Sequence, residues 1–202
     1  MATERQPSVV VFVPIVEGHG EVQAVPALLH RLAQQLNPDI AVRVNPPIRV
    51  KSGSFLNDKD YFRQQISLAA AKAAQANGHV LILLDCEDDC PATLGPEILR
   101  RAQGIRADVS IQVFLAYREY ETWFLAAAGS LQGHAGLPTH LAPPADPEGI
   151  RNAKGWLSQH MPHPYDPIVH QLDFTRAFDF EQARTIDSFR RLHDQIRILL
   201  VS

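Results

Sequence analysis

Cysteine is scarce in this sequence of 202 residues, which contains only Cys86 and Cys90. Both cysteines lie beside a run of acidic residues rather than at spacings that predict a disulfide framework. This scarcity argues against a disulfide-stabilised extracellular domain, and we expect a protein of the reducing cytoplasm. A zinc site built on this pair also has little support, because there is no second cysteine pair and the neighbouring acids are hard oxygen ligands.

An excess of positive charge is also lacking. Lys and Arg together number 19 against 22 Asp and Glu, which gives a formal net charge of -3 at pH 7. A protein that holds nucleic acid by its own charge needs a basic face. Any nucleic-acid chemistry is therefore expected to depend on metal ions, on a partner or on a dimer.

Long hydrophobic runs are absent as well. The first apolar segment, Val9 to Val16, contains Pro14 and follows Glu4 and Arg5, so it fits neither a signal peptide nor a membrane span. The apolar content of 46% is nevertheless enough to bury a full core. We expect a soluble cytoplasmic protein that does not associate with membranes.

Apolar runs alternate with helical patterns over the first 130 residues, which predicts an α/β fold with a mostly parallel four-stranded sheet flanked by helices. The expected strands are 8–16, 40–44, 79–84 and 109–116. The expected helices follow the glycine turn at 18–20 and run through Leu36, then over 58–76, 95–103 and 120–128. Residues 49–54 are predicted to be a basic, flexible loop.

After Gly129 the character of the sequence changes. Residues 133–149 are rich in proline and glycine and predict a long surface loop. Short helical segments are expected near 147–161, 180–183 and 188–200. We therefore predict an α/β core over residues 1–130 and, over residues 131–202, a loop and C-terminal helical cap packed on that core as one structural domain.

Acidic residues follow three of the expected strands at short distance. Glu17 and Glu21 follow the first, the run from Asp85 to Asp89 follows the third, and Glu119 and Glu121 follow the last. The carboxyl ends of parallel strands converge at one edge of a sheet, where ligands bind. Close carboxylates raise one another's pKa unless a cation neutralises them. The pattern predicts one shared site for Mg²⁺ or Mn²⁺, ions that oxygen ligands suit.

Within this cluster the strand geometry favours particular ligands. Alternate residues leaving a strand project to the same side, so Glu17, Asp85 and Glu87 are predicted as inner ligands, and Asp89 extends the same row. For any one acid taken alone, a solvated loop charge is the commoner explanation. The hypothesis depends on the coincidence of acids at three strand ends.

Basic and imidazole side chains near the same edge are candidate phosphate contacts. His19 lies in the glycine turn, and Arg118 stands beside the third acidic pair. For any one of them, ordinary surface charge is the usual explanation. The candidates are His19, Arg49, Lys51, Arg118, Arg151 and Lys154.

Several motifs resemble those of known families. The order strand, Glu17-Gly18, helix, strand, helix, strand, Asp85-x-Glu87, helix, strand, Glu119-Tyr-Glu121 resembles the Toprim fold of topoisomerases, primases, recombination factors and OLD-type nucleases. More narrowly, nearly the whole chain resembles the bacterial family called domain of unknown function 4276. The motifs that carry this resemblance are Val16-Glu-Gly-His-Gly-Glu21, Leu84-Asp-Cys-Glu-Asp-Asp-Cys-Pro-Ala92, Arg118-Glu-Tyr-Glu-Thr-Trp-Phe124, Ala153-Lys-Gly-Trp-Leu157 and Ser188-Phe189.

The Toprim resemblance implies roles for individual residues. Glu17 takes the place of the first-strand glutamate, a general acid or base or a metal ligand. Asp85 and Glu87 match the Asp-x-Asp metal pair, with glutamate at the second position. Resemblance to the nucleases implies that Glu21 and Glu121 complete a second metal position, whereas Glu119 is expected to point elsewhere.

The resemblance also implies a function. We expect a metal-dependent phosphodiesterase of Toprim type that cleaves nucleic acid with one or two Mg²⁺ or Mn²⁺ ions, with Glu17, Asp85 and Glu87 as catalytic residues. Similarity to the OLD nucleases implies a separately encoded ATPase partner and a role in defence against phage. The alternative is a catalytically silent module that binds metal or nucleotide and regulates its partner.

Overall fold

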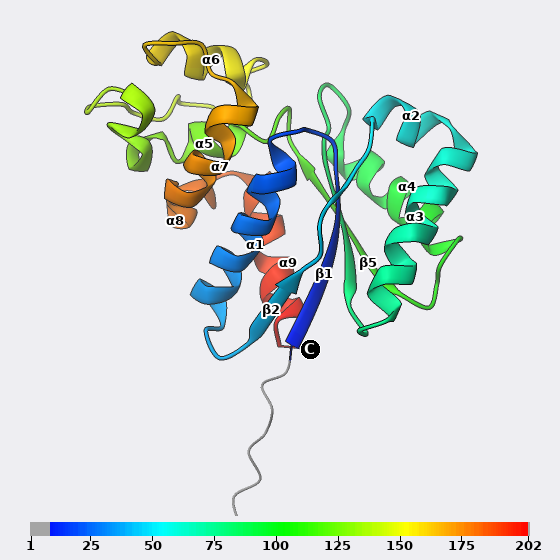
Figure 1. The fold of residues 1–202 in the computed structure, drawn as a ribbon. Coiled ribbons are helices and arrows are strands. Elements are labelled where there is room, and N and C mark those ends of the chain that lie inside the picture. The colour runs from blue at the N-terminus through cyan, green and yellow to red at the C-terminus, as the bar shows by residue number, and fades with distance from the viewer. Residues whose placement is uncertain (1–8, 202) are drawn as a thin grey trace, which may run out of the picture.

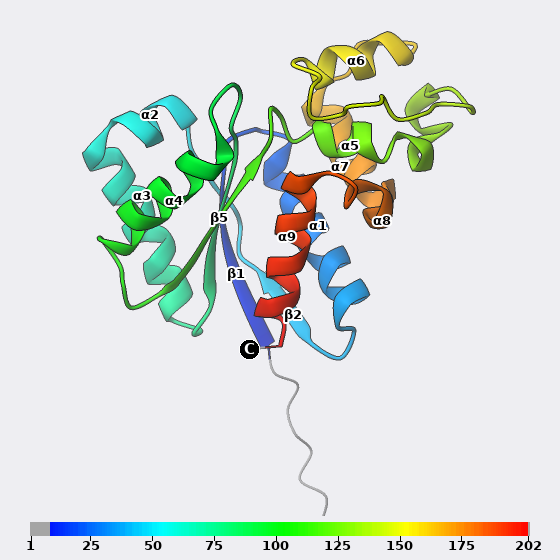
Figure 2. The same ribbon diagram turned by 180° about the vertical axis from the view of Figure 1, so that it is seen from behind.

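The computed structural model describes residues 9–201 and has helices on both faces of a parallel sheet (Figures 1 and 2). The main strands lie in the order β2-β1-β4-β5, and a two-residue strand, β3, pairs with the end of β1. This confirms the predicted α/β class and the mostly parallel sheet; the predicted start at Ser8 lies outside the described residues. The strands are β1 (Val9–Val16), β2 (Ala41–Val44), β3 (Ile48–Arg49), β4 (His79–Asp85) and β5 (Ser110–Ala116).

The helices follow the expected alternation through β5 and continue into a helical C-terminal part. They are α1 (Glu21–Leu36), α2 (Ser52–Asn57), α3 (Lys59–Ala74), α4 (Pro91–Gln103), α5 (Thr122–Ala126), α6 (Ala153–His160), α7 (Pro167–Ala177), α8 (Phe180–Ala183) and α9 (Asp187–Leu199). Short 3-10 turns lie at Ala128–Leu131 and His134–Gly136.

Two hydrophobic layers sandwich the sheet, because successive residues of a strand point to opposite faces. Phe12 and Val16 of β1 belong to the layer formed with α1 and α9. Val13 and Ile15 of the same strand belong to the layer formed with α2, α3 and α4. Figures 1 and 2 show these helices on opposite sides of the sheet.

Helices α5 to α8 gather at the end of the molecule where β1 and β4 finish, and α2 lies at the same end across the sheet (Figure 1). Trp123 of α5 joins this group to α9. Its Nε1 donates a hydrogen bond to Oγ of Ser188 at 3.1 Å, and its ring packs edge-on against Phe189. The carboxyl edge of the sheet is thus flanked by segments from both halves of the chain.

Two segments differ from the sequence-based expectation. Residues 52–57 form α2 rather than a flexible loop, because Phe55 is fully buried against the ring of Phe62. Helix α7 is not predicted at all. It begins with Pro167, whose missing N–H is not needed at a first helical position, and the carboxylate of Asp166 accepts a hydrogen bond from the backbone of Ile168 at 2.8 Å.

None of the helices in the described part of the chain is both long and apolar enough to cross a membrane.

Candidate active site at the carboxyl edge of the sheet

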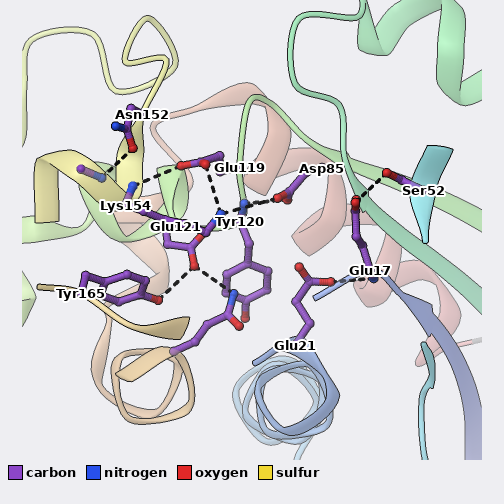
Figure 3. A network of polar contacts seen from close by, with 12 residues as sticks. Glu17, Glu21, Ser52, Asp85, Glu119, Tyr120, Glu121, Asn152, Lys154 and Tyr165 are labelled. Carbon is purple, nitrogen blue, oxygen red and sulfur yellow. Dashed lines mark hydrogen bonds and ion pairs between the residues drawn. The ribbon is translucent and has the colours of Figure 1, made fainter. Parts of the chain in front are cut away.

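The predicted site lies where the order of the strands reverses. From β1 the chain passes to β2 on one side, whereas β4 and β5 lie on the other side. Ligands of open α/β sheets bind at such a point, outside the carboxyl ends of the strands. Glu17 directly follows β1, and Asp85 is the last residue of β4. Figure 3 shows these two side chains close to Glu21, with Glu121 and Lys154 on the other side of the site.

Glu21 closes the turn between β1 and α1. Its Oε2 accepts a hydrogen bond from the backbone N–H of Glu17 at 3.0 Å, and only 4% of the residue is exposed. Burial raises the pKa of Glu21 to about 7, and the carboxylates of Glu121 and Glu17 add to the rise, while hydrogen bonds from the Gly18 and Glu17 backbones oppose it. Glu21 is therefore a buried acid whose charge is poorly compensated at neutral pH.

Neighbouring atoms lie too close to Gly18 and Gly20 to leave room for a side chain at either position. A Cβ atom on Gly18 would lie 2.9 Å from Oε1 of Glu21. A Cβ atom on Gly20 would collide with Oε1 of Gln171 and with the carbonyl of Pro167, both in α7. The Gly-His-Gly turn therefore lets Glu21 fold back and lets α7 reach the site.

Glu17 is held from the other side of the sheet. Its Oε1 accepts a hydrogen bond from Oγ of Ser52 at 2.6 Å. Ser52 is the first residue of α2, which follows the strand β3 that pairs with the end of β1. No local sequence pattern predicts this contact, because 35 residues separate the two partners.

Asp85 occupies the middle of the site. Its Oδ1 accepts a hydrogen bond from the backbone N–H of Tyr120 at 2.8 Å, and 16% of its side chain is exposed. Burial raises the pKa of Asp85 well above its usual value, and Glu21 and Glu121 raise it further, whereas Lys154 lowers it. Repulsion among these acids is therefore a property of the folded protein.

Glu121 is the most deeply buried acid of the site, with no exposed surface. Its Oε1 accepts hydrogen bonds from the hydroxyl of Tyr165 at 3.0 Å and from Nε2 of Gln171 at 3.3 Å. Its Oε2 lies 3.1 Å from Nζ of Lys154 and forms an ion pair with it. Burial raises the pKa of Glu121, against the opposing charge of Lys154.

Lys154 brings a positive charge into this acidic edge. Its Nζ lies 3.1 Å from Oε1 of Glu119 and 4.0 Å from Oδ2 of Asp85, in addition to its pairing with Glu121. Burial alone would lower the pKa of Lys154, but the neighbouring carboxylates outweigh that effect and raise it. The ammonium group therefore remains charged at neutral pH.

The side chain of Glu119 lies at the site, whereas we expected it to point elsewhere. Its Oε2 accepts a hydrogen bond from the backbone N–H of Lys154 and its Oε1 one from the Nζ of that lysine, both at 3.1 Å. Glu119 is therefore a positioning residue for Lys154.

The extended conformation of β4 ends at Asp85. Glu87 has a left-handed φ of 48°, so the alternation of an extended strand ends before it. The side chains of Glu87 and Asp89 are exposed, and neither pairs with a cation of residues 9–201. The structure thus brings together Glu17, Glu21, Asp85 and Glu121, hereafter the carboxylate group, and leaves Glu87 and Asp89 exposed.

The candidate phosphate contacts lie in different surroundings. Arg118 pairs with Asp88 and donates to the carbonyl of Glu87 at 3.2 Å, so it braces the turn after β4. His19 and Lys51 are exposed next to Glu17 and Ser52, the residues that link β1 to α2. Of the predicted phosphate contacts, only Lys154 forms ion pairs with the carboxylate group.

The donor chemistry of the carboxylate group suits a divalent cation. Carboxylate oxygens are the ligands that Mg²⁺ and Mn²⁺ prefer, and the raised pKa values of Glu21, Asp85 and Glu121 reflect burial that opposes their charged forms. As the side chains are placed, residues 9–201 contain no group of three Asp, Glu, His or Cys residues that could hold an ion. Binding would therefore require side chains of the group to reorient.

The layered fold and this edge define a Rossmann-like α/β protein with an acidic site at the carboxyl ends of parallel strands. The chain belongs to the family described as Domain of unknown function (DUF4276), whose family model matches residues 16–197. The matched segment contains the whole carboxylate group together with Glu119 and Lys154. Neither the curated proteins nor the solved structures include a match to this chain.

Proposed function

We propose that this protein is a Mg²⁺- or Mn²⁺-dependent phosphodiesterase of Toprim type, a nuclease that cleaves a nucleic-acid backbone. The observation that supports the proposal is the carboxylate group, whose four acids come from the turn after β1, from α1, from the end of β4 and from the segment before α5, and meet where the strand order reverses. The pKa values of three of them are raised by burial. A divalent cation at this point would relieve the repulsion.

The chain offers ligands for one or two ions. We assign a first ion to Glu17 and Asp85 and a second to Glu21 and Glu121. When bound, such ions lower the pKa of a water molecule and stabilise charge on phosphoryl oxygens. Glu87 and Asp89, which the strand pattern predicts as ligands, would reach the ions only after the turn at 86–89 changes conformation.

The remaining residues of the site would hold the substrate and the ligands in place. Lys154 carries a charge that can contact a phosphoryl oxygen, and Glu119 fixes its position. Ser52 orients Glu17, and Tyr165 and Gln171 orient Glu121. These contacts would reduce the freedom of the ligands before substrate binds.

The resemblance to OLD-type nucleases extends this proposal to a biological setting. A separately encoded ATPase would act together with the protein in defence against phage. A homodimer is a second arrangement that would enlarge the surface available to nucleic acid.

A second candidate is a catalytically silent module that binds metal or nucleotide and regulates its partner. The pairing of Lys154 with Asp85, Glu119 and Glu121 favours it, because an ammonium group already neutralises part of the site. In that case, the acids would serve to hold the lysine.

One experiment separates the two candidates. Purified protein is incubated with Mg²⁺ or Mn²⁺ and with single-stranded and duplex DNA and RNA. Cleavage that EDTA and Asp85→Asn both abolish is the expected result. Asp39→Asn removes the same charge at an exposed turn after α1 and should cleave as wild type does. Metal binding by calorimetry without cleavage of any substrate would instead support the silent module.

A further inference from the structure

A small pocket opens beside the carboxylate group, at the side where β3 meets α2. Its volume is about 350 Å³, and its lining residues are Arg49, Val50, Lys51, Ser54, Asp58 and Tyr61. Arg49 pairs in register with Val16, the residue before Glu17. Ser52, next to Lys51, donates the hydrogen bond that holds Glu17. The pocket and the carboxylate group therefore share one short stretch of backbone.

The pocket carries positive charge that the protein does not neutralise. Arg49 and Lys51 are exposed, and within residues 9–201 neither forms an ion pair. Oδ1 of Asp58 already accepts hydrogen bonds from the backbone N–H groups of Asp60 and Tyr61, at 2.9 and 3.0 Å, and so caps α3. The pocket therefore holds two cations and one carboxylate, whose Oδ1 is already engaged, and this excess of positive charge suits a phosphate group.

An aromatic ring completes the pocket. Tyr61 is half-buried against the layer formed with α2, α3 and α4, and its hydroxyl has no hydrogen-bond partner within residues 9–201. A ring beside cations is the combination that binds a nucleobase and its phosphate in single strands. A base paired within a duplex presents only its edges, so it cannot stack on such a ring without being unpaired.

We propose that this pocket binds one nucleotide of a single-stranded nucleic acid, next to the nucleotide that lies at the carboxylate group. Arg49 and Lys51 contact its phosphate, and the base stacks on Tyr61. The assignment rests on the proposed nuclease function and names the form of its substrate. It also explains how a chain with a net charge of -3 holds nucleic acid, because local cations adjoin the acids.

The charge contribution is tested by fluorescence anisotropy with fluorescein-labelled (dT)12 and CaCl2. Arg49→Ala/Lys51→Ala is compared with Arg43→Ala/Lys72→Ala, which removes two charges in β2 and late in α3. We expect about tenfold weaker binding by the first variant only. Its plot of log affinity against log salt should be shallower by about 0.7, because the two side chains neutralise one phosphate and each phosphate neutralised on a single strand contributes about 0.7. Equal affinities of the two double variants would overturn the proposal.

The stacking contribution is tested with Tyr61→Leu and Tyr61→Phe. Loss of the ring should weaken binding of (dT)12 by about tenfold, whereas Tyr61→Phe keeps the ring and should bind as wild type does. Both variants must unfold at temperatures near that of wild type, since Tyr61 also packs on the core. A loss of affinity shared by both variants, or none in either, would contradict stacking.

Two further probes identify the source of the ligand. A duplex of the same length should bind more weakly than (dT)12, and its affinity should not change with Tyr61→Leu. If dTMP alone displaces (dT)12 at equal concentration, the pocket binds a free nucleotide and the assignment to a strand is wrong. Hydrolysis of bis(p-nitrophenyl) phosphate by the wild-type protein with Mn²⁺ tests the proposed nuclease function separately. If this reaction fails while binding of (dT)12 still depends on the pocket residues, the proposed nuclease function is wrong and the proposed nucleotide-binding pocket stands.

Discussion

Glu119 contacts Lys154 twice, with one carboxylate oxygen on the backbone N–H and the other on the ammonium group, both at 3.1 Å. The two contacts fix the start of α6 and the end of its long side chain at the same time. They bring Lys154 next to Glu121 and Asp85, so the acidic edge contains its own cation. Any activity of the site is expected to depend on this pair.

Glu119→Gln should lower metal-dependent cleavage by about tenfold, which corresponds to about 1.4 kcal/mol of transition-state stabilisation. The amide oxygen of glutamine can still accept from the backbone of Lys154, but the neutral group no longer attracts the ammonium. The measurement is kcat for Mn²⁺-dependent cleavage. Glu97→Gln, an exposed residue of α4, is the matched control. Full activity of Glu119→Gln would show that Lys154 needs no positioning.

The buried acids should make the metal-free protein less stable as the pH rises. The pKa of Glu21 is about 7 in the folded protein against an ordinary value of 4.5, so the folded state binds the proton more tightly than the unfolded state does. The stabilising contribution of the protonated form is complete below about pH 4.5 and is lost as the pH rises through about 7.

Urea denaturation in EDTA between pH 5 and pH 8 measures this effect. The free energy of unfolding of wild type should fall over this interval, by at most about 3 kcal/mol from Glu21. Glu21→Gln mimics the protonated form and should show a smaller fall, although Asp85 and Glu121 shift in the same direction. If the free energy of unfolding falls equally with pH in the two proteins, the Glu21 carboxylate is better solvated than its burial indicates.

Asp85 should respond differently to two substitutions. Both Asp85→Asn and Asp85→Ala remove a charge from a repulsive group, and both should abolish divalent-dependent activity. Only asparagine keeps an oxygen that can accept the hydrogen bond from the backbone of Tyr120. Leaving that N–H unpaired costs about 1–3 kcal/mol.

Thermal unfolding in EDTA distinguishes these effects. Asp85→Asn should melt at a higher temperature than wild type, and Asp85→Ala should melt below Asp85→Asn. A lower melting temperature for both variants would argue that repulsion among the acids is small. Cleavage activity retained by either variant would count against the proposed site.

The sequence predicts the central strands β1 and β4 well, because each is a continuous apolar run that leads directly into an acidic residue. It fails at α7, whose buried face combines Phe174 with two polar residues. Gln171 and Thr175 of this helix are buried, while Ile168 and Val169 are 64% and 61% exposed. Hydrophobic periodicity identifies a helix best when its buried face is apolar, and on the buried face of α7 Gln171 instead donates a hydrogen bond to Glu121.

The candidate site is predicted in part for a similar reason. Acids at the ends of strands can be read from the order of residues, and the structure brings Glu17, Glu21, Asp85 and Glu121 together as expected. The local backbone at Glu87 cannot be read in this way, because its left-handed φ interrupts the alternation on which the ligand assignment depended. Tyr165 lies 44 residues from its partner Glu121, and no local pattern indicates such a contact.

Divalent ions should stabilise the protein in proportion to their occupancy of the carboxylate group. Mn²⁺ at a hundredfold excess over its dissociation constant should raise the free energy of unfolding by about 2.7 kcal/mol for one site. If two ions bind, calorimetric titration should give a stoichiometry of two for wild type and one for Glu121→Gln. Glutamine keeps the oxygen that accepts from Tyr165, so the variant should remain folded.

Asp39→Asn provides the comparison for that titration, since it removes one exposed charge after α1 and should leave the stoichiometry unchanged. Metal affinity should also rise between pH 5 and pH 8, because ions bind the deprotonated acids and the pKa of Glu21 lies at about 7. Unfolding curves that do not change with either Mg²⁺ or Mn²⁺ would argue against a metal site. A stoichiometry of two that persists in Glu121→Gln would instead remove Glu121 from the ligands while leaving Glu17 and Asp85 in place.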